Sequence, residues 1–269
     1  MNILKIISAL ICLFAFSSCQ KVIDVNLNDA QPQYVIEAPM FEGVHDFKVH
    51  ITKTSNYFDT DQPATVNNAV VVLKDPNSTS ITLTPQGNGW YQIADFNAIP
   101  LSNYQLEVFI DGKSFTAHST MPFQTPIDSL TTKEFGGFGP PKPDGANQLL
   151  LVHLKDSMNV KNYYRVLITQ NDTFLNKPSN YYLFDDMVRD GLQIDAPIFT
   201  SIFKKGDKVD VELLCMDEAV YDYFNSLSEV ITGDANTGAA PANPNSNFSN
   251  GALGYFAAYA SSKMSIVIP

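Results

Sequence analysis

The chain has 269 residues, of which 45% are hydrophobic and 17% charged, and its formal net charge is −11 at pH 7. This composition excludes an intrinsically disordered chain and supplies enough apolar side chains for a large core. The acidic balance argues against nucleic acid and against broad adsorption to anionic membranes, because both carry negative charge. Among the cysteines, Cys215 is expected to be a buried hydrophobic side chain rather than a nucleophile, since no histidine lies near it in the sequence.

The start of the chain has the pattern of a secretory signal. Lys5 supplies a positive charge, residues 6–16 are almost entirely apolar, and two small serines follow. The apolar run is too short to cross a hydrocarbon core of ~30 Å as a helix. Because Cys19 comes next, we interpret residues 1–18 as a lipoprotein signal and predict that Cys19 is acylated and becomes the first mature residue. Residues 19–33 would then be a tether to the lipid anchor, and an ordinary signal peptide with an incidental cysteine is the alternative.

Residues 30–122 are predicted to form a β-sandwich domain. Hydrophobic and polar side chains alternate in short stretches such as residues 47–52, and turn residues separate these stretches at regular spacing. The strongest turn signal is Asp111–Gly112, a dipeptide typical of two-residue hairpins. Because no helical period interrupts the strands, we expect an immunoglobulin-like sandwich, with Trp90 in its core.

Residues 123–269 are predicted to form a second β-rich domain with one amphipathic helix. The helix covers about residues 218–232, where hydrophobic residues recur every three or four positions, and Asp217 is its expected N-cap. Residues 149–154 and 163–169 are expected to pair with each other around a polar turn. Further strands are predicted at residues 127–135, 199–203, 209–215, 253–259 and 264–268. The whole chain is therefore expected to be mainly β.

Motifs that would identify an enzyme do not occur in the sequence. We find no spacing typical of nucleophile-elbow hydrolases, zinc proteases or P-loop proteins, and the four histidines stand apart. We therefore expect a protein without catalytic residues and without a cofactor.

The densest acidic stretch is residues 184–195, which contain four aspartates. Calcium prefers carboxylate oxygens, so Asp185, Asp186 and Asp190 are the candidates for a Ca²⁺ site. The stretch lacks the glutamate that closes the twelve-residue calcium loop, so a solvated acidic loop is the main expectation. Two of these carboxylates working as an acid/base pair are a third interpretation.

Aromatic side chains beside loops are the candidates for contact with a ligand or partner. Tyr181 and Tyr182 lie between a proline and the acidic stretch, and Phe138 lies in the glycine- and proline-rich residues 136–145. Exposed aromatic residues commonly anchor partners or stack on sugars. A second long polar loop is predicted at residues 233–251; loops of this length inside a domain are often functional.

Several short motifs, taken in chain order, resemble a known family. These motifs are Cys19, Tyr34–Val35–Ile36–Glu37, Asn56–Tyr57–Phe58, Asn68–Ala69–Val70–Val71–Val72, Gly89–Trp90–Tyr91, Met121–Pro122, Pro126–Ile127–Asp128–Ser129, Asn243–Pro244, Asn247 and Gly251–Ala252–Leu253–Gly254–Tyr255–Phe256. Together they resemble the Bacteroidota lipoproteins of domain-of-unknown-function family 4249. The resemblance implies an outer-membrane lipoprotein, often encoded beside TonB-dependent receptors, with no established activity. Residues 69–117 also resemble a carboxypeptidase-regulatory or transthyretin-like sandwich, a likeness that concerns the fold alone.

The anchor, the missing catalytic motifs and the two long loops favour a non-catalytic accessory lipoprotein. We expect it on the outer membrane, at the cell surface rather than the periplasmic face, as a binding partner of a TonB-dependent receptor in nutrient uptake. One alternative is a surface hydrolase of glycans or peptides that uses the acidic loop. Another is a structural or adhesive module of the cell surface.

Overall fold

The structure is a computed structural model that describes residues 31–55, 62–135, 147–177, 181–187, 190–232 and 243–269. Cys19 and Phe138 lie outside these ranges. Contacts divide the chain into Met1–Gln31 and Pro32–Pro269, and every element named below belongs to the second unit. Among the residues described, no helix is long and apolar enough to cross a membrane.

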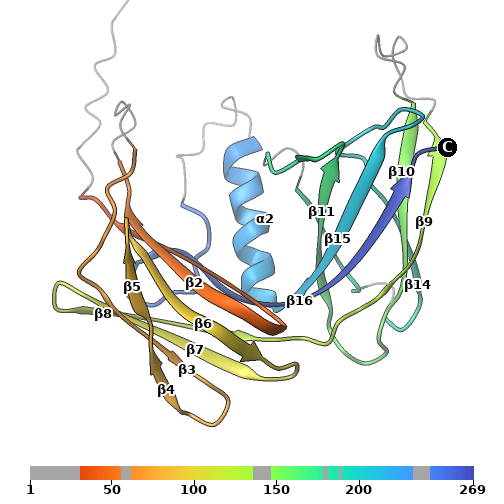
Figure 1. The fold of residues 1–269 in the computed structure, drawn as a ribbon. Coiled ribbons are helices and arrows are strands. Elements are labelled where there is room, and N and C mark those ends of the chain that lie inside the picture. The colour runs from red at the N-terminus through yellow and green to blue at the C-terminus, as the bar shows by residue number, and fades with distance from the viewer. Residues whose placement is uncertain (1–30, 56–61, 136–146, 178–180, 188–189, 233–242) are drawn as a thin grey trace, which may run out of the picture. The chain divides into compact units, whose positions relative to one another are not determined.

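The fold is mainly β, as the sequence predicts, with several sheets and the predicted helix (Figure 1). The first strands are β1 (Tyr34–Phe41), β2 (Gly43–Lys53), β3 (Val70–Lys74), β4 (Ser80–Thr82), β5 (Thr84–Gly87), β6 (Trp90–Ala98), β7 (Asn103–Ile110) and β8 (Lys113–Thr120). The later elements are β9 (Ile127–Glu134), β10 (Gln148–Lys155), β11 (Tyr163–Gln170), β12 (Thr173–Phe174), β13 (Tyr182–Asp185), β14 (Gln193–Pro197), β15 (Lys208–Met216), α2 (Glu218–Thr232) and β16 (Leu253–Val267).

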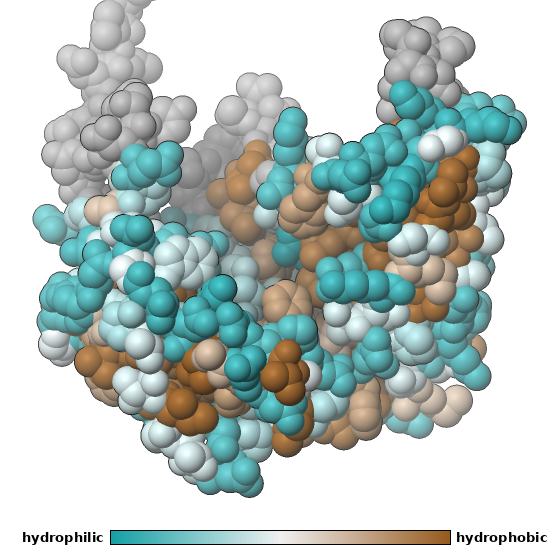
Figure 2. All heavy atoms as spheres, in the orientation of Figure 1, coloured by the Kyte–Doolittle hydropathy of each residue, from teal (hydrophilic) through white to brown (hydrophobic). Residues whose placement is uncertain are grey.

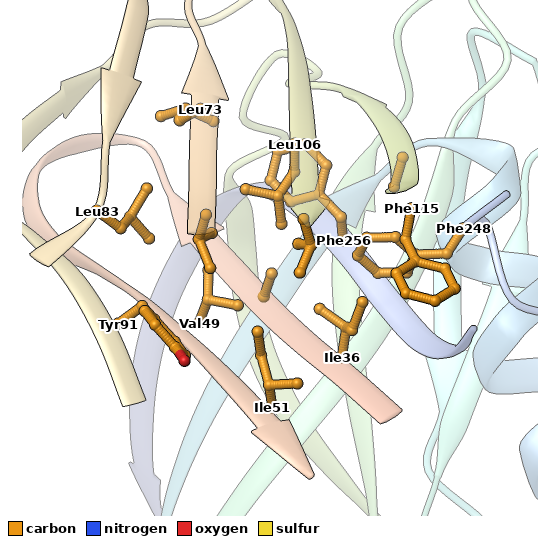
Figure 3. Packing of buried hydrophobic residues seen from close by; sticks show 14 of the residues in the cluster. Ile36, Val49, Ile51, Leu73, Leu83, Tyr91, Leu106, Phe115, Phe248 and Phe256 are labelled. Atoms are coloured by element: carbon orange, nitrogen blue, oxygen red, sulfur yellow. The ribbon is translucent and has the colours of Figure 1, made fainter. Parts of the chain in front are cut away.

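These strands form three sheets. A nine-stranded sheet has the order β12-β11-β15-β16-β1-β2-β6-β5, with β13 also paired to β11, and the smaller sheets have the orders β4-β3-β7-β8 and β14-β10-β9. One hydrophobic core packs β1, β2 and β6 against β3, β7 and β8, and Figure 3 shows its side chains pointing toward one another. A second core packs β11 and β15 against β9, β10 and β14. The result is two sandwiches that use one long sheet.

Strand β16 contributes to both cores. Its first half pairs parallel to β1, and its second half pairs antiparallel to β15. The prediction of two separate strands, 253–259 and 264–268, is therefore wrong. The polar residues between them suggest a break, but Ser262 and Lys263 stay paired with Leu213 and Glu212 of β15. Their side chains are also satisfied: Ser262 Oγ accepts the Ile127 N–H at 2.9 Å, and Lys263 forms an ion pair with Glu212 at 3.3 Å.

The predicted pairing of residues 149–154 with residues 163–169 is also wrong. Strand β10 pairs with β9 and β14, whereas β11 pairs with β12, β13 and β15. The polar segment between β10 and β11 carries the chain from one sheet to the facing sheet, so both strands bury hydrophobic side chains in the second core. Residues 199–203 form no strand; Phe203 makes only an isolated bridge to Gln148.

Local signals gave correct predictions. Helix α2 covers the predicted residues, and Asp217 Oδ1 accepts the Val220 N–H at 3.0 Å as an N-cap does. The Asp111–Gly112 turn joins β7 to β8 with φ angles of 48° and 75°, the left-handed values that a type I′ hairpin needs. Cys215 is buried, and burial raises the pKa of its thiol, so it behaves as a hydrophobic side chain.

Candidate functional site

A row of aromatic and charged side chains crosses the nine-stranded sheet on the face opposite the first core. On neighbouring strands, Trp90 lies opposite His50, His50 lies opposite Glu37, and Glu37 lies opposite Tyr255. Paired residues of neighbouring strands point to the same side of a sheet. Beyond Tyr255 the row continues onto α2 and β11. We call this set the open-face row: Trp90, His50, Glu37, Tyr255, Phe224, Arg165 and Tyr181.

Trp90 begins this row and does not lie in the core, contrary to the sequence prediction. Its exposed fraction is 42%, whereas the neighbouring Tyr91 is fully buried. The Tyr91 hydroxyl donates to the Val66 carbonyl at 2.9 Å and accepts the Ala69 N–H at 3.0 Å. Because side chains alternate along β6, the inward position of Tyr91 turns Trp90 to the opposite face.

The indole of Trp90 forms one wall of a surface pocket. It stacks on the His50 imidazole with ring centroids 4.2 Å apart and planes inclined by 14°. The pocket has a volume of about 390 Å³ and is lined by Lys48, Gln86, Gly87, Asn88, Trp90, Tyr91 and Gln92. An aromatic ring surrounded by amide side chains and one lysine suits a polar ligand that has one apolar face.

Negative charge lies in the middle of the row. Glu37 Oε2 is 3.8 Å from His50 Nδ1. Burial, followed by the charge of Glu37, raises the pKa of Tyr255 to about 12, so its hydroxyl stays protonated at neutral pH. Tyr255 also contacts α2, with its ring centroid 4.9 Å from those of both Tyr223 and Phe224.

Arg165 lies at the far end of the row, on the face of β11 that α2 covers. Its guanidinium carbon is 4.0 Å from the ring centroid of Phe224 and 4.3 Å from that of Tyr181, and these rings are nearly perpendicular, at 76°. Figure 1 shows α2 lying against this face beside β16 and β11, and Figure 2 shows hydrophobic residues gathered over the end of α2, where Val230 and Ile231 are exposed.

The guanidinium of Arg165 is buried, and no residue in the described part of the chain gives it an anionic partner. The residue is 8% exposed, its Nε is buried without a hydrogen-bond partner, and no carboxylate within the described ranges forms an ion pair with it. Desolvating a charge costs roughly several kcal/mol even after the protein relaxes. A cation–π contact in a desolvated place returns about 2 kcal/mol. The two rings therefore offset part of the cost of burying this charge, but they do not accept its N–H groups as conventional hydrogen bonds.

The two tyrosines singled out by the sequence are separated in the structure. Tyr181 joins Arg165 and Phe224 in the open-face row, whereas Tyr182 turns to the other side of the sheet. There its ring centroid is 5.8 Å from that of Phe184, and burial raises the pKa of its hydroxyl. Phe138 lies outside the described residues, as does Cys19.

The structure brings two of the three candidate aspartates, Asp186 and Asp190, together with Asp156, which the sequence did not suggest. Oxygens of Asp156, Asp186 and Asp190 lie within 4.8 Å of one another, whereas Asp185 is not part of this group. Burial raises the pKa of Asp186 and the charge of Asp156 adds to this, while hydrogen bonds from Asn162 act in the opposite direction. Asp156 accepts the Tyr164 hydroxyl at 2.6 Å. The oxygen set suits a divalent cation, and no spacing in the sequence links Asp156 to the other two.

A hydroxyl, an imidazole and a carboxylate also line up on the three-stranded sheet. Thr131 Oγ1 is 2.7 Å from His153 Nε2, and His153 Nδ1 is 2.6 Å from Asp195 Oδ1. The residues come from β9, β10 and β14, three neighbouring strands. The geometry has the order nucleophile, base and orienting carboxylate that hydrolases use. The sequence does not predict this arrangement, because its three residues are distant in the chain and meet only through strand pairing.

Of the predicted loop at residues 233–251, the structure describes residues 243–251. This part forms hydrogen bonds with β8. Ser249 exchanges hydrogen bonds with the Thr116 backbone, donating its N–H to the carbonyl at 2.8 Å and accepting the N–H on its hydroxyl at 2.9 Å. Asn247 accepts the Phe256 N–H at 3.0 Å and donates to the Phe256 carbonyl at 2.7 Å. These residues therefore help to close the first core.

Fold and site together define a β-sandwich protein with a partly buried aromatic surface, and this surface contains a cation that no described carboxylate pairs with. The family model "Domain of unknown function (DUF4249)" matches residues 20–265, and the chain belongs to this family. The resemblance drawn from the sequence motifs is confirmed at that level. No curated protein matches the chain. Among solved structures, a two-domain fibronectin type III segment of chicken tenascin is 9% identical, covers 69% of this chain and 91% of its own, and has a TM-score of 0.21.

Proposed function

We propose that this protein is a Bacteroidota outer-membrane lipoprotein, anchored at the cell surface through Cys19, that binds a TonB-dependent receptor or that receptor's ligand in nutrient uptake. The signal pattern that ends at Cys19 supports the anchor. The observation that supports binding is the open-face row, which offers an exposed indole at one end and, at the other, a buried guanidinium that has no anionic partner among the described residues. Tryptophan, tyrosine and arginine are the residues that most often dominate binding energy.

The test is mild crosslinking on cells, followed by purification of the lipoprotein. The TonB-dependent receptor encoded beside it should be recovered with it. Trp90→Ala should reduce that recovery by about tenfold, the scale of a moderate hot spot. Phe109→Ala is the matched control, because Phe109 is also 42% exposed but lies on β7, in another sheet. Repeated recovery of the unaltered lipoprotein alone would overturn the proposal.

A surface hydrolase of glycans or peptides is the second candidate, and Thr131–His153–Asp195 is the observation that favours it. Asp195 belongs to the acidic stretch that the sequence suggested. Thr131→Ala and Asp195→Asn should abolish turnover on a panel of ester, glycan and peptide substrates. Ser129→Ala is the control, because Ser129 lies directly opposite His153 in the register. Absence of turnover by the unaltered protein on the whole panel removes this candidate.

A further inference from the structure

The guanidinium of Arg165 has donors that nothing in the described chain accepts. A guanidinium carries five N–H donors in a planar fork, and aromatic rings accept none of them as conventional hydrogen bonds. Phe224 and Tyr181 approach its carbon at 4.0 and 4.3 Å, and Nε is buried without a partner. More than nine-tenths of the residue is buried. Buried polar groups in native proteins are nearly always paired, so an orphan of this kind indicates a missing partner.

The surroundings indicate what that partner should be. Burial raises the pKa of Tyr223 and holds that of Tyr255 at about 12, so both hydroxyls remain neutral donors at physiological pH. Glu37 is the carboxylate whose charge reaches these two tyrosines, and it forms no ion pair with Arg165 among the described residues. A neutral apolar ligand would leave the guanidinium unpaired, and a cation would be repelled by it.

A pocket begins two residues along β11 from Arg165, and Arg165 itself does not line it. Leu167, two residues further along the strand, borders this pocket of about 390 Å³ lined by Leu167, Thr169, Phe174, Asp210, Val211, Glu212, Lys263, Met264 and Ser265. The two carboxylates in this pocket are already paired, Glu212 with Lys263 at 3.3 Å and Asp210 with Lys208 at 3.2 Å. The one cation on this face without an anionic partner among the described residues is therefore Arg165.

We propose that Arg165 binds the carboxylate of an organic ligand whose apolar part lies against Tyr181, Phe224 and Tyr255. A carboxylate accepts two parallel N–H bonds from a guanidinium fork, which matches the donors left open here. This inference rests on the proposed function, since the ligand would be what the anchored protein captures or presents to its receptor. Because aromatic rings lie beside the guanidinium, we expect an aromatic or branched carboxylate to bind more tightly than acetate.

The experiment titrates the complete mature lipoprotein, in detergent micelles, with benzoate, acetate and inorganic phosphate at constant ionic strength. Calorimetry and thermal unfolding report binding, because a ligand that binds only the folded state raises the Tm. Benzoate should bind at least tenfold more tightly than acetate. Arg165→Met should abolish both signals, and Tyr181→Leu should weaken benzoate several-fold. Lys208→Met, which removes an exposed cation on the neighbouring strand, should change neither.

Three outcomes would overturn the inference. They are no carboxylate-dependent signal in the unaltered protein, binding of phosphate alone, and equal binding by Arg165→Met. The first two are read on the unaltered protein, so they decide the matter even if a variant does not fold. Receptor recovery after crosslinking is measured separately, so that a protein which binds its receptor but no carboxylate refutes only this inference.

Discussion

Ser119 Oγ donates a 2.6 Å hydrogen bond to Asp217 Oδ2, and this contact connects the first sandwich to the start of α2. The same carboxylate accepts the Thr120 N–H at 2.8 Å, and its other oxygen caps the helix through Val220. Ser119 Oγ in turn accepts the Ala258 N–H of β16 at 2.8 Å. One carboxylate therefore positions the helix that carries Phe224 over the sheet that carries Tyr255.

Asp217→Ala should lower the free energy of unfolding by about 2–3 kcal/mol, because it removes a helix cap and two hydrogen bonds to a charged acceptor. Urea unfolding measures this loss. Ser119→Ala and the double variant complete a cycle, in which the coupling energy should be at least about 0.5 kcal/mol. Strict additivity of the two single changes would contradict the described contact.

Gly254→Ala should prevent β16 from seating beside β1. Gly254 has φ +92°, and a Cβ built on it would lie 2.1 Å from the Ile36 carbonyl oxygen. We expect a loss of at least about 3 kcal/mol, the scale of the most damaging substitutions. Gly87→Ala separates strain from collision, because Gly87 has φ +83° and open space around it. That control should cost about 1–2 kcal/mol, and equal losses at both sites would refute the steric explanation.

Asp207 should make the fold sensitive to acid. Burial alone would raise its pKa, but hydrogen bonds from the Lys204 N–H, Asn171 and Gln170 lower it below its ordinary value of 3.8. A carboxyl group whose pKa is lowered by folding stabilises the protein above its unfolded-state pKa, and this stabilisation is lost as the pH falls through the folded-state pKa. Urea unfolding from pH 7 to pH 2 should therefore show a smaller acid-dependent loss in Asp207→Asn than in the unaltered protein. An identical acid dependence would contradict this role.

Asp186→Asn should stabilise the protein at neutral pH. Burial and the nearby Asp156 raise the pKa of Asp186, so the folded state holds its proton more tightly than the unfolded state does. Stability is then lost as the pH rises through the two pKa values, and removing the charge should raise the free energy of unfolding at pH 7. Asp185→Asn, outside the three-carboxylate group, should have little effect. Greater destabilisation by Asp186→Asn than by Asp185→Asn would show that the ionised carboxylate is needed there.

Cys19→Ser should abolish membrane attachment if Cys19 carries the lipid. Fractionation should move the protein out of the membrane fraction or leave an uncleaved precursor, and intact-mass analysis of the unaltered protein should show acyl chains on a chain that begins at Cys19. Cys215→Ser is the control and should leave attachment unchanged. A lipid-free mature chain, or one that begins at another residue, would remove the anchor from the proposed function.

Sequence reasoning succeeded where neighbours along the chain decide the structure. The spacing that defines α2, the cap at Asp217 and the left-handed turn at Asp111–Gly112 are local, so a few consecutive residues determine each of them. Local sequence does not determine which side chains of β6 face the core, because Trp90 and Tyr91 are both aromatic and either could point inward. The packing partners of Tyr91, which lie far away in sequence, decided it.

The site depended on pairing that no local pattern contains. In the sequence, Arg165 is a single charged residue within a hydrophobic strand, which does not mark it as part of a site. Its contact with Phe224 forms only because α2 folds back onto β11. Thr131 and His153 likewise meet only because β9 pairs with β10 in one register. Tyr181 was identified because an aromatic residue beside a loop is a general signal for contact, although its cationic neighbour was not foreseen.

The dual pairing of β16 also has a consequence for biogenesis. Residues near position 36 find their hydrogen-bonding partners near position 254, and both cores need side chains from β16. Pairings this distant in sequence slow folding. A nascent polypeptide that lacks residues 253–267 can therefore complete neither sandwich, and both cores form only after this strand has been synthesised.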